Sequence, residues 1–395
     1  MYRDHGVVPK ASRDDNNNKP SDDLSAYQLV EVGDLVINKM KAWQGSVAIS
    51  RVRGIVSPAY FTYQATHEED QRFLHYLMRS QRYITGYLSL SKGIRVNQWD
   101  LEPQYHSRMP VLLPPRGEQQ RIADLLDHET EKIDALVEQQ RRLIELLKEK
   151  RQAVISQAVM KGLDPKVPMK DSGVKWLGMV PAHWEVKSIR YIIDAIGDVD
   201  HFMPQSVEKG VPYLMTGDLK DIVSEVSLDD CKQVSHSDYL DLSKRIRTAK
   251  GDVVMARYAT IGTLMYVDVD VELLVSYSCV TLKTNHSKMS GMYLFQYMKS
   301  DAFSQAVEYQ VNTNTQGNVG INDLKTLKVA VPPIYEQDLI ATFLASEKVK
   351  IDALEAESER AIAVLKERRS ALISAAVTGK IDVRGLMPQP EAIAA

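Results

Sequence analysis

Three short stretches carry residue types that catalysis on nucleic acids requires, and each departs from a working motif. Residues 331–335 (VPPIY) are the nearest string to the [DN]PP[YF] loop of adenine methyltransferases, but they lack its leading acid or amide. Glu185 and Lys187, with Asp171 upstream, match the acidic-x-Lys fragment of a nuclease site, which is common by chance. A GxxxxGK[ST] phosphate loop is missing. The sequence therefore predicts a chain with no catalytic or metal-binding residues of its own.

Basic, aromatic and amide side chains follow two strand-like segments and could contact DNA instead. Arg and Lys pair with guanine or phosphate, and Asn or Gln with adenine edges. The candidates that follow the strands are Lys39, Lys41, Trp43 and Gln44, and later Arg257, Tyr258 and Thr260. The candidates on polar loops are Lys10, Arg13, Lys19, Arg95, Asn97, Gln98, Asn312, Asn314, Gln316 and Asn318. For each residue an ordinary solvated loop position is the alternative, and Trp43 could equally be a core residue.

The composition excludes several classes of protein. The 395 residues are 44% hydrophobic and 26% charged, which is an ordinary globular balance. No apolar run approaches the roughly 20 residues of a membrane span, and the polar start is no signal peptide. Cys231 and Cys279 form no CxxC pair, so we expect neither a disulfide framework nor a zinc knuckle, and a reducing cytoplasm fits. The net charge of -3 does not indicate a polyanion partner, although a local positive stripe remains possible.

Two long helical patterns organise the chain, one over 116–163 and the other over 336–380. Placed 218 residues apart (336 minus 118), they match at many positions, among them Glu118/Glu336, Gln119/Gln337, Ile122/Ile340, Leu126/Leu344, Asp134/Asp352, Leu136/Leu354, Arg151/Arg369 and Ser156/Ser374. A long helix that recurs after a domain-sized insert indicates an internal duplication.

The insert is itself a copy of the first domain, which gives the order domain, helix, domain, helix. We expect a first sheet-containing domain at 1–115, a connector with a second domain at 164–335, and a disordered tail at 381–395. Small drifts in the offset place Asp100-Leu101 on Asp323-Leu324, and Met109–Leu113 is expected to be a last strand before two prolines. About fifty residues from Trp176 to Thr216 have no counterpart in the first domain. Either that domain is smaller or its N-terminal part is missing, and we favour the second explanation.

Apolar residues recur at 3-4 spacing along both helices, which favours coiled-coil pairing over two separate amphipathic helices. The polar breaks in the seam that we assign are Glu129, Gln140 and Lys150 in the first helix and Glu347, Ser358 and Arg368 in the second. A parallel pair would set like charges against each other, whereas an antiparallel pair centred near Gln140 and Ser358 brings opposite charges together. The expected fold is therefore α+β, with two sheet-containing domains and an antiparallel intramolecular helix pair that relates them by a pseudo-twofold repeat.

Two similar domains on a rigid spacer suit two half-sites on duplex DNA, because half-site separation follows from protein geometry. The rival interpretation is a non-catalytic scaffold with two protein- or glycan-binding modules on a coiled coil. Binding of duplex DNA that depends on salt separates the two interpretations.

The chain resembles the specificity subunits of Type I restriction–modification systems over nearly its full length. The stretches that carry the resemblance are LPPRGEQQRIADLLDHETEKIDAL at 113–136, DSGVKWLGMVPAHWEV at 171–186, VPYLMTGDL at 211–219, KGDVVMARYATIG at 250–262 and VPPIYEQDLIATFL at 331–344. In the first domain YRDHGVVPK, GDLVINKMKAWQGS and GIVSPAYF look like a variant of the family's target-recognition domain.

The resemblance implies two target-recognition domains separated by two conserved antiparallel helices, with no catalysis in this subunit. It also implies a cytoplasmic complex for phage defence that reads a bipartite DNA sequence and contains two methylation (M) subunits and restriction (R) subunits. S-adenosylmethionine, ATP and Mg would belong to those partners only. Typical members begin both halves with a segment like 171–216, and this chain has it once. The resemblance therefore implies a shortened first domain, and an inactive or half-reading subunit is a further alternative.

Overall fold

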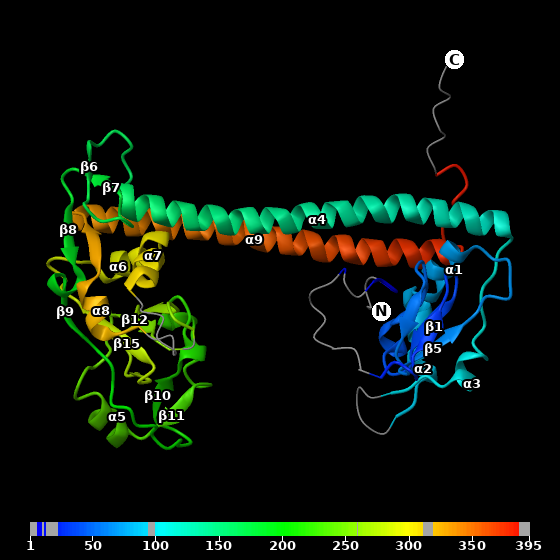
Figure 1. Ribbon diagram of the computed structural model, residues 1–395, viewed down its shortest axis with the longest axis horizontal. Helices are drawn as coiled ribbons and strands as arrows, with labels where there is room; N and C mark the ends of the chain where they lie inside the picture. Colours follow the sequence, from blue (N-terminus) through cyan, green and yellow to red (C-terminus); the bar gives the residue numbers. More distant parts are fainter. Residues whose placement is uncertain are drawn as a thin grey trace, which may run out of the picture. The chain divides into compact units, whose positions relative to one another are not determined.

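The computed structural model describes residues 6–9, 12, 23–93, 99–258, 260–310 and 319–386. Contacts divide the chain into two units, Met1–Arg142 with Ser358–Ala395 and Leu143–Glu357. Two long helices, α4 (Arg116–Lys161) and α9 (Ile334–Val377), contribute to both units (Figure 1). The α+β class with sheet-containing domains beside two long helices, which the sequence predicts, is confirmed.

The first unit contains a small antiparallel sheet, a two-stranded ribbon and short helices beside the long ones. The sheet has the strand order β3-β2-β5, and the ribbon pairs β1 with β4. Its strands and short helices are β1 (Gln28–Val30), β2 (Leu35–Asn38), β3 (Val47–Ile49), β4 (Gly54–Val56), β5 (Tyr60–Tyr63), α1 (Gln71–Met78), α2 (Gln81–Leu90) and α3 (Pro103–His106). Gly33 takes a φ of +97°, so the turn expected before β2 is made by a residue that tolerates this backbone.

The strand expected at Met109–Leu113 is absent, which corrects the sequence-based expectation. This segment is irregular and leads directly into α4. Its counterpart in the second unit, β16 (Lys328–Val331), is a strand because it pairs with β8 (Glu185–Ser188). A strand needs a partner for its backbone groups, and β8 lies in the stretch that has no counterpart in the first domain.

The second unit is larger and contains four separate sheets. The main antiparallel sheet has the order β13-β12-β15-β9, a second has the order β11-β10-β14, and β16-β8 and β6-β7 form two-stranded ribbons. The remaining strands are β6 (Met169–Asp171), β7 (Met179–Pro181), β9 (Ile193–Gly197), β10 (Val211–Leu214), β11 (Lys232–Val234), β12 (Val253–Ala256), β13 (Leu264–Tyr266), β14 (Leu274–Val275) and β15 (Cys279–Thr284). Its short helices are α5 (His236–Leu242), α6 (Gly291–Met298), α7 (Asp301–Gln310) and α8 (Ile321–Thr326).

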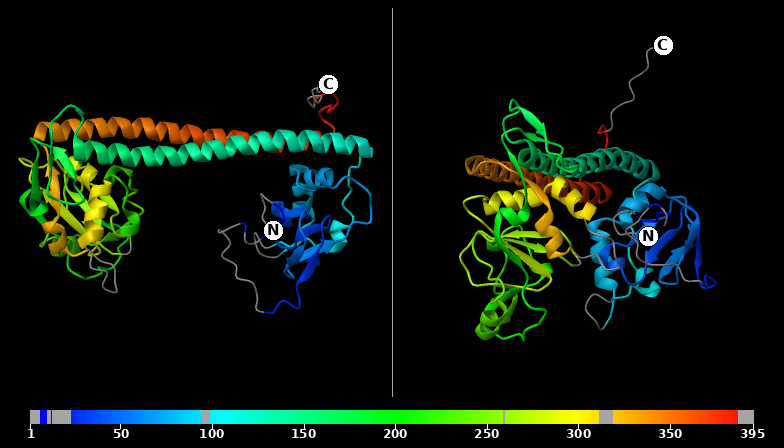
Figure 2. Two further views of the ribbon diagram at one scale, coloured as in Figure 1. Left: turned by 45° about the horizontal axis from the view of Figure 1, so that its top comes forward. Right: turned by 60° about the vertical axis from the view of Figure 1, so that its left-hand side comes forward.

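The main core of the second unit lies where α6 and α7 separate the sheet from the long helices, as Figures 1 and 2 show. Trp184 and Tyr293 are fully buried there, together with apolar residues of β12 and β15. Near the end of α4, Ile155 and Val159 share this core with Ile340 near the start of α9. The two helices therefore run antiparallel within this unit.

One ion pair between the long helices is made twice, once in each unit. In the first unit Arg369 Nε donates to Asp134 Oδ1 at 3.0 Å. In the second unit Arg151 Nη2 donates to Asp352 Oδ1 at 2.6 Å and to Glu355 Oε2 at 2.9 Å. Arg151 and Arg369, like Asp134 and Asp352, are the positions that the repeat relates. The antiparallel orientation is thus the predicted one, although its contacts are different residues.

The helix seam lies one residue later than we expected at every second position. Val137 is 7% exposed, whereas Leu136 is 45% exposed and its counterpart Leu354 is 50% exposed. Both choices are apolar at this point in the sequence, so spacing alone could not decide between them. The expected charge contacts change accordingly. Within the described residues the ion pairs found for the two seam glutamates stay on their own helices, Glu129 with Lys132 and Glu347 with Lys350.

Arg368 nevertheless lies near Glu129, as the antiparallel pairing requires. The pKa of Glu129 is lowered first by the hydrogen bond from Lys132 and, among smaller causes, by the charge of Arg368. Of the two central residues, Ser358 is buried and Gln140 is half-buried.

A buried glutamine joins the start of each long helix to the domain beside it. In the second unit, Gln337 Nε2 donates to Pro332 O at 2.8 Å and to Lys288 O at 3.0 Å. Its Oε1 accepts the N–H of Ser290, which precedes α6, at 2.8 Å. All three groups belong to the backbone, so one side chain holds the entry to α9 against the entry to α6.

The first unit repeats this joint with Gln119. Its Nε2 donates to Pro114 O at 2.8 Å, and its Oε1 accepts the N–H of Asp70, which caps α1, at 3.0 Å. Its Nε2 also donates to the carboxylate of Glu69. Both glutamines are fully buried. This glutamine joint therefore fixes each domain to its helix by the same geometry.

Replacing Gln337 by Leu should lower the free energy of unfolding of the second unit by about 2 kcal/mol or more, because buried backbone groups lose their partners. Urea denaturation of the full chain measures the loss, and hydrogen exchange at the Ser290 amide locates it. The matched control is Asp338→Leu on the neighbouring exposed position, which should change stability by no more than about 1 kcal/mol. Equal effects of the two substitutions would show that the joint has no special role.

Candidate nucleic-acid interface

The candidate residues of the first unit follow β2, and Lys39 begins the loop. Its Nζ donates to Pro58 O at 2.6 Å and lies 4.4 Å from the centre of the Phe61 ring. Its N–H donates to Ala59 O at 3.0 Å. The charge of Lys39 is therefore held against its own domain, and it supports the loop more than it extends from it.

Trp43 lies at the surface of the same loop, on a 3-10 turn η2 (Ala42–Gln44). Its indole N–H donates to Met40 O at 3.0 Å, and its ring packs edge-to-face on Trp99 at 4.9 Å. Both tryptophans are half-buried, and the neighbouring Lys41 is exposed. An aromatic pair next to a free cation is a suitable surface for a nucleic-acid chain, since bases stack on aromatic rings and phosphates attract lysine.

The loop that contains Arg95, Asn97 and Gln98 ends at the same place. These three residues lie outside the described residues, but both ends of their loop are described. Lys92 and Asp100 form an antiparallel bridge that closes it, and the N–H of Leu101 donates to Lys39 O at 3.1 Å. The fold thus brings the ends of the two candidate loops of the first domain together.

The second unit repeats this arrangement at Arg257, which follows β12. The N–H of Val319 donates to Arg257 O at 3.3 Å, just as that of Leu101 donates to Lys39 O. Leu101 therefore corresponds to Val319 at the constant offset of 218 residues (319 minus 101). Our alignment of Leu101 with Leu324 is wrong, because no insertion separates the two loops from their helices.

Arg257 is buried, which corrects its assignment as a DNA contact. Its guanidinium pairs with the buried carboxylate of Asp198 and donates to Val319 O at 3.3 Å. Its N–H donates to Ser278 O at 2.9 Å. Arg257 therefore joins four chain segments beneath the loop. The sequence could not reveal this, since nothing near Arg257 in the chain indicates the distant Asp198.

Tyr258 and Thr260 lie on the loop above Arg257. Tyr258 is half-buried, with its ring centre 5.2 Å from the guanidinium carbon of Arg257, and Thr260 is exposed. Thr260 therefore presents its side chain to solvent, and Tyr258 does so in part. The remaining predicted contacts lie outside the described residues, namely Lys10, Arg13, Lys19, Asn312, Asn314, Gln316 and Asn318.

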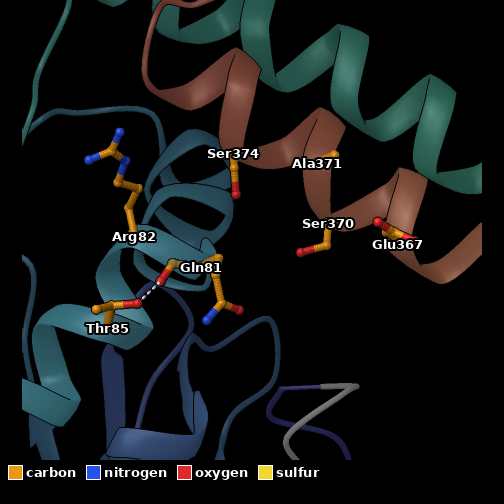
Figure 3. Close-up of a pocket in the computed structure, with 7 residues that line it drawn as sticks. All are labelled: Gln81, Arg82, Thr85, Glu367, Ser370, Ala371 and Ser374. Atoms are coloured by element: carbon orange, nitrogen blue, oxygen red, sulfur yellow. Dashed lines mark hydrogen bonds between the residues drawn. The ribbon is translucent and has the colours of Figure 1, made fainter.

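A hollow of about 610 Å³ lies between α2 and α9 in the first unit (Figure 3). Ser374 of α9 lines it with a buried hydroxyl that has no hydrogen-bond partner in the described residues. At the related place in the second unit, Ser156 donates to Asp301 at 3.1 Å and closes the gap. Gln81 stands in place of Asp301, so this hollow follows from a substitution in the repeat and not from a set of catalytic groups.

Other titratable groups have structural roles. Burial raises the pKa of the Cys279 thiol to about 11, so it is not a thiolate at neutral pH. Burial also opposes ionisation of Glu336, but hydrogen bonds from Trp184, His183 and Tyr335 outweigh this effect and lower its pKa. Among the described residues no cluster of His, Cys, Asp and Glu could hold a metal ion. Nor does any helix in the described part of the chain have the length and apolar character that a membrane span requires.

Comparison with known proteins identifies the family. A family model for the Type I restriction modification DNA specificity domain matches residues 181–362. The putative type I restriction enzyme MjaX specificity subunit of Methanocaldococcus jannaschii is 22% identical over 380 residues, 92% of this chain and 81% of the relative. The type I restriction enzyme EcoKI specificity subunit of Escherichia coli is 23% identical over 333 residues, 81% of this chain and 68% of the relative.

Solved structures show the same fold. A chain from a study of complex assembly and conformational transition of the type I R-M system aligns with a TM-score of 0.67 and 17% identity, covering 90% of this chain and 85% of that one. The HsdS subunit from Thermoanaerobacter tengcongensis aligns with a TM-score of 0.53 and 17% identity, covering 89% and 82%. With the repeated domain-and-helix order, these likenesses place the chain: it belongs to the specificity subunits of type I restriction–modification systems.

Proposed function

We propose that this chain reads a bipartite sequence in duplex DNA, with one recognition loop cluster in each domain, and that it has no catalytic activity by itself. The observation that carries the proposal is the repeated site. In each unit the strand that precedes the candidate loop ends at a residue, Lys39 or Arg257, whose carbonyl also holds the end of a second loop. Two equivalent loop clusters on two equivalent domains suit two half-sites.

The side chains that reach solvent determine which contacts we assign. In the first domain Lys41 and Gln44 flank the Trp43–Trp99 pair, and lysine and amide groups recognise phosphates and base edges. In the second domain Tyr258 and Thr260 stand on the loop that Arg257 supports. Arg257 itself is a positioning residue, because its guanidinium is already bonded inside the domain.

The long helices are the proposed docking surface for the methylation subunits. Leu136 and Leu354 are exposed at positions that the repeat relates, and so are Leu146 and Val364. Such repeated apolar positions suit two copies of one partner, and we assign two methylation subunits to them, with restriction subunits joining the complex. S-adenosylmethionine, ATP and Mg are then bound by those partners, and the assembly acts on DNA in the cytoplasm.

A scaffold with two protein- or glycan-binding modules remains the alternative. It predicts no dependence of binding on DNA sequence and no role for Lys41. The DNA-reading proposal predicts both, so the two functions are distinguishable with single substitutions in the assembled complex.

Lys41→Glu should weaken duplex binding by the assembled complex and reduce the slope of log K against log salt by about 1, since one phosphate contact is lost. Titrations at several salt concentrations measure the slope. The matched control is Arg53→Glu, because Arg53 is exposed and lies at the opposite end of the β2–β3 hairpin. Equal slopes for the two variants would remove Lys41 from the interface.

Arg257→Met should instead act through stability. It leaves Asp198 buried without its principal cation, which costs about 3 kcal/mol, while the paired change Asp198→Leu with Arg257→Met should restore much of the loss. Urea denaturation measures both variants. If the single variant kept its stability but lost the salt dependence of DNA binding, Arg257 would be a direct contact after all.

Inserting one heptad into each long helix should lengthen the spacer between half-sites and leave the half-sites unchanged. The insertions belong after Arg142 and after Arg360, midway between the repeated ion pairs, so that both helices keep their pairing. Seven residues add about 10 Å of helix, or about three base pairs. Mapping of methylated adenines reads both results, and altered half-site bases would show that the helices read sequence themselves.

A further inference from the structure

The same segment of the repeat is buried in one unit and exposed in the other. In β16, Val329 is 1% exposed and Val331 is 7% exposed. Their counterparts 218 residues earlier, Val111 and Leu113, are 40% and 48% exposed. Leu112 between them is 53% exposed. Three consecutive apolar side chains thus lie in solvent at positions where the fold buries them in its second copy.

The second unit shows what covers this segment. β8 pairs antiparallel with β16, setting Lys187 opposite Val329 and Glu185 opposite Val331. Because Ile189 donates its N–H to Leu327 O at 2.9 Å, every second residue of β16 turns its backbone towards β8. These residues are Leu327, Val329 and Val331.

The alternate residues of β16 turn their backbones inward to tyrosines of α6. Tyr297 donates its hydroxyl to Lys328 O at 3.3 Å, and Tyr293 donates to Ala330 O at 3.2 Å. The strand is therefore satisfied on both sides, by side chains on the inner side and by β8 on the outer side.

In the first unit only the inner side is satisfied. The hydroxyl of Tyr83 donates to Pro110 O at 3.1 Å and accepts the N–H of Leu112 at 3.0 Å. Within the described part of the chain, no hydrogen bond is found for the backbone of Val111 or Leu113. These are the two residues whose counterparts pair with β8. The segment is held in place but keeps an open outer edge, the feature that strand addition uses.

A cavity of about 580 Å³ adjoins this edge and has its own counterpart. Gly86, Ser89 and Pro110 are among the residues that line it. The repeat places Ala306, Tyr309 and Lys328 at these positions in the second unit.

There the position above these residues is taken by Trp176, which belongs to the stretch without a counterpart. Its ring centre lies 5.6 Å from that of Tyr309, and its indole N–H donates to Lys328 O at 3.4 Å. The cavity therefore opens where the second unit places an indole.

The neighbouring part of the first unit is already covered by the chain itself. Val383, just after α9, is buried in the same core as Ile122 and Leu126. Arg384 lies close enough to Glu118 for its pKa to be raised in part by that charge, after the larger effect of Asp382. What stays open is the strand edge and the cavity, so the opening is local.

We propose that Met109–Leu113 and the adjacent cavity form an acceptor site for an extended segment of a separate polypeptide. The segment adds an antiparallel strand to the open edge and places an aromatic side chain in the cavity. Its chemistry is that of residues 174–190 of this chain, in which Trp176 precedes a strand of four residues that begins at Glu185. The inference rests on the internal repeat and not on DNA reading.

A labelled peptide of residues 174–190, titrated into the full-length chain without DNA, tests the proposal. We expect saturable one-to-one binding, with hydrogen-exchange protection at the amides of Val111 and Leu113. Two peptide variants should each weaken binding at least about tenfold: Trp176→Ala, which empties the cavity, and Lys187→Pro, which removes a ladder donor. Binding that is indifferent to both changes would overturn the proposal, as would no binding at millimolar peptide.

On the protein, Val111→Pro should abolish binding, whereas the control Val111→Ala keeps the backbone N–H and should bind. Circular dichroism establishes that both variants fold, and Leu113→Pro provides a second test if the first does not. Sedimentation of the chain without peptide examines the other occupant. Concentration-dependent dimers that Val111→Pro removes would overturn the assignment to a separate polypeptide and identify a second copy. Since DNA takes no part, failure here leaves the proposed function untouched.

Discussion

The buried glutamine at the start of each long helix is the contact on which the rest of the structure depends. Gln119 and Gln337 each bond the carbonyl of a preceding proline and the first amide of a domain helix. A domain that reads DNA must keep a fixed orientation on the element that carries it, because base contacts fail when groups move by about 1 Å. Repeating the joint in both units lets one docking geometry serve two domains whose loops differ.

The two halves differ where the repeat is incomplete, and the consequences are local. The second unit has β8 and Trp176 over β16, and the first unit has neither over Met109–Leu113. The sheet beside the glutamine joint is nevertheless formed, since β2 pairs with β3 and β5 on its own. The loop cluster that follows β2 is built on that sheet. A shortened domain can therefore keep its candidate reading surface while it leaves an edge open elsewhere.

Much of this organisation is readable from the sequence, because duplication prints each structural position twice. The helices, the antiparallel orientation and the equivalence of Lys39 with Arg257 follow from the repeat. The seam phase does not, since Leu136 and Val137 are both apolar and only packing distinguishes them. Nor does the burial of Arg257, which depends on Asp198, 59 residues away in the chain. The missing strand at Met109–Leu113 required a partner that the sequence comparison showed to be absent, a consequence that spacing alone does not express.

The central claim is that this chain selects the DNA sequence on which a methylating complex acts. A genome-wide map of methylated adenines, in one host with and without this gene, tests it most directly. The account predicts a gene-dependent motif of two short half-sites separated by a fixed run of unspecified bases. Identical maps, in a host where the complex is assembled, would contradict it.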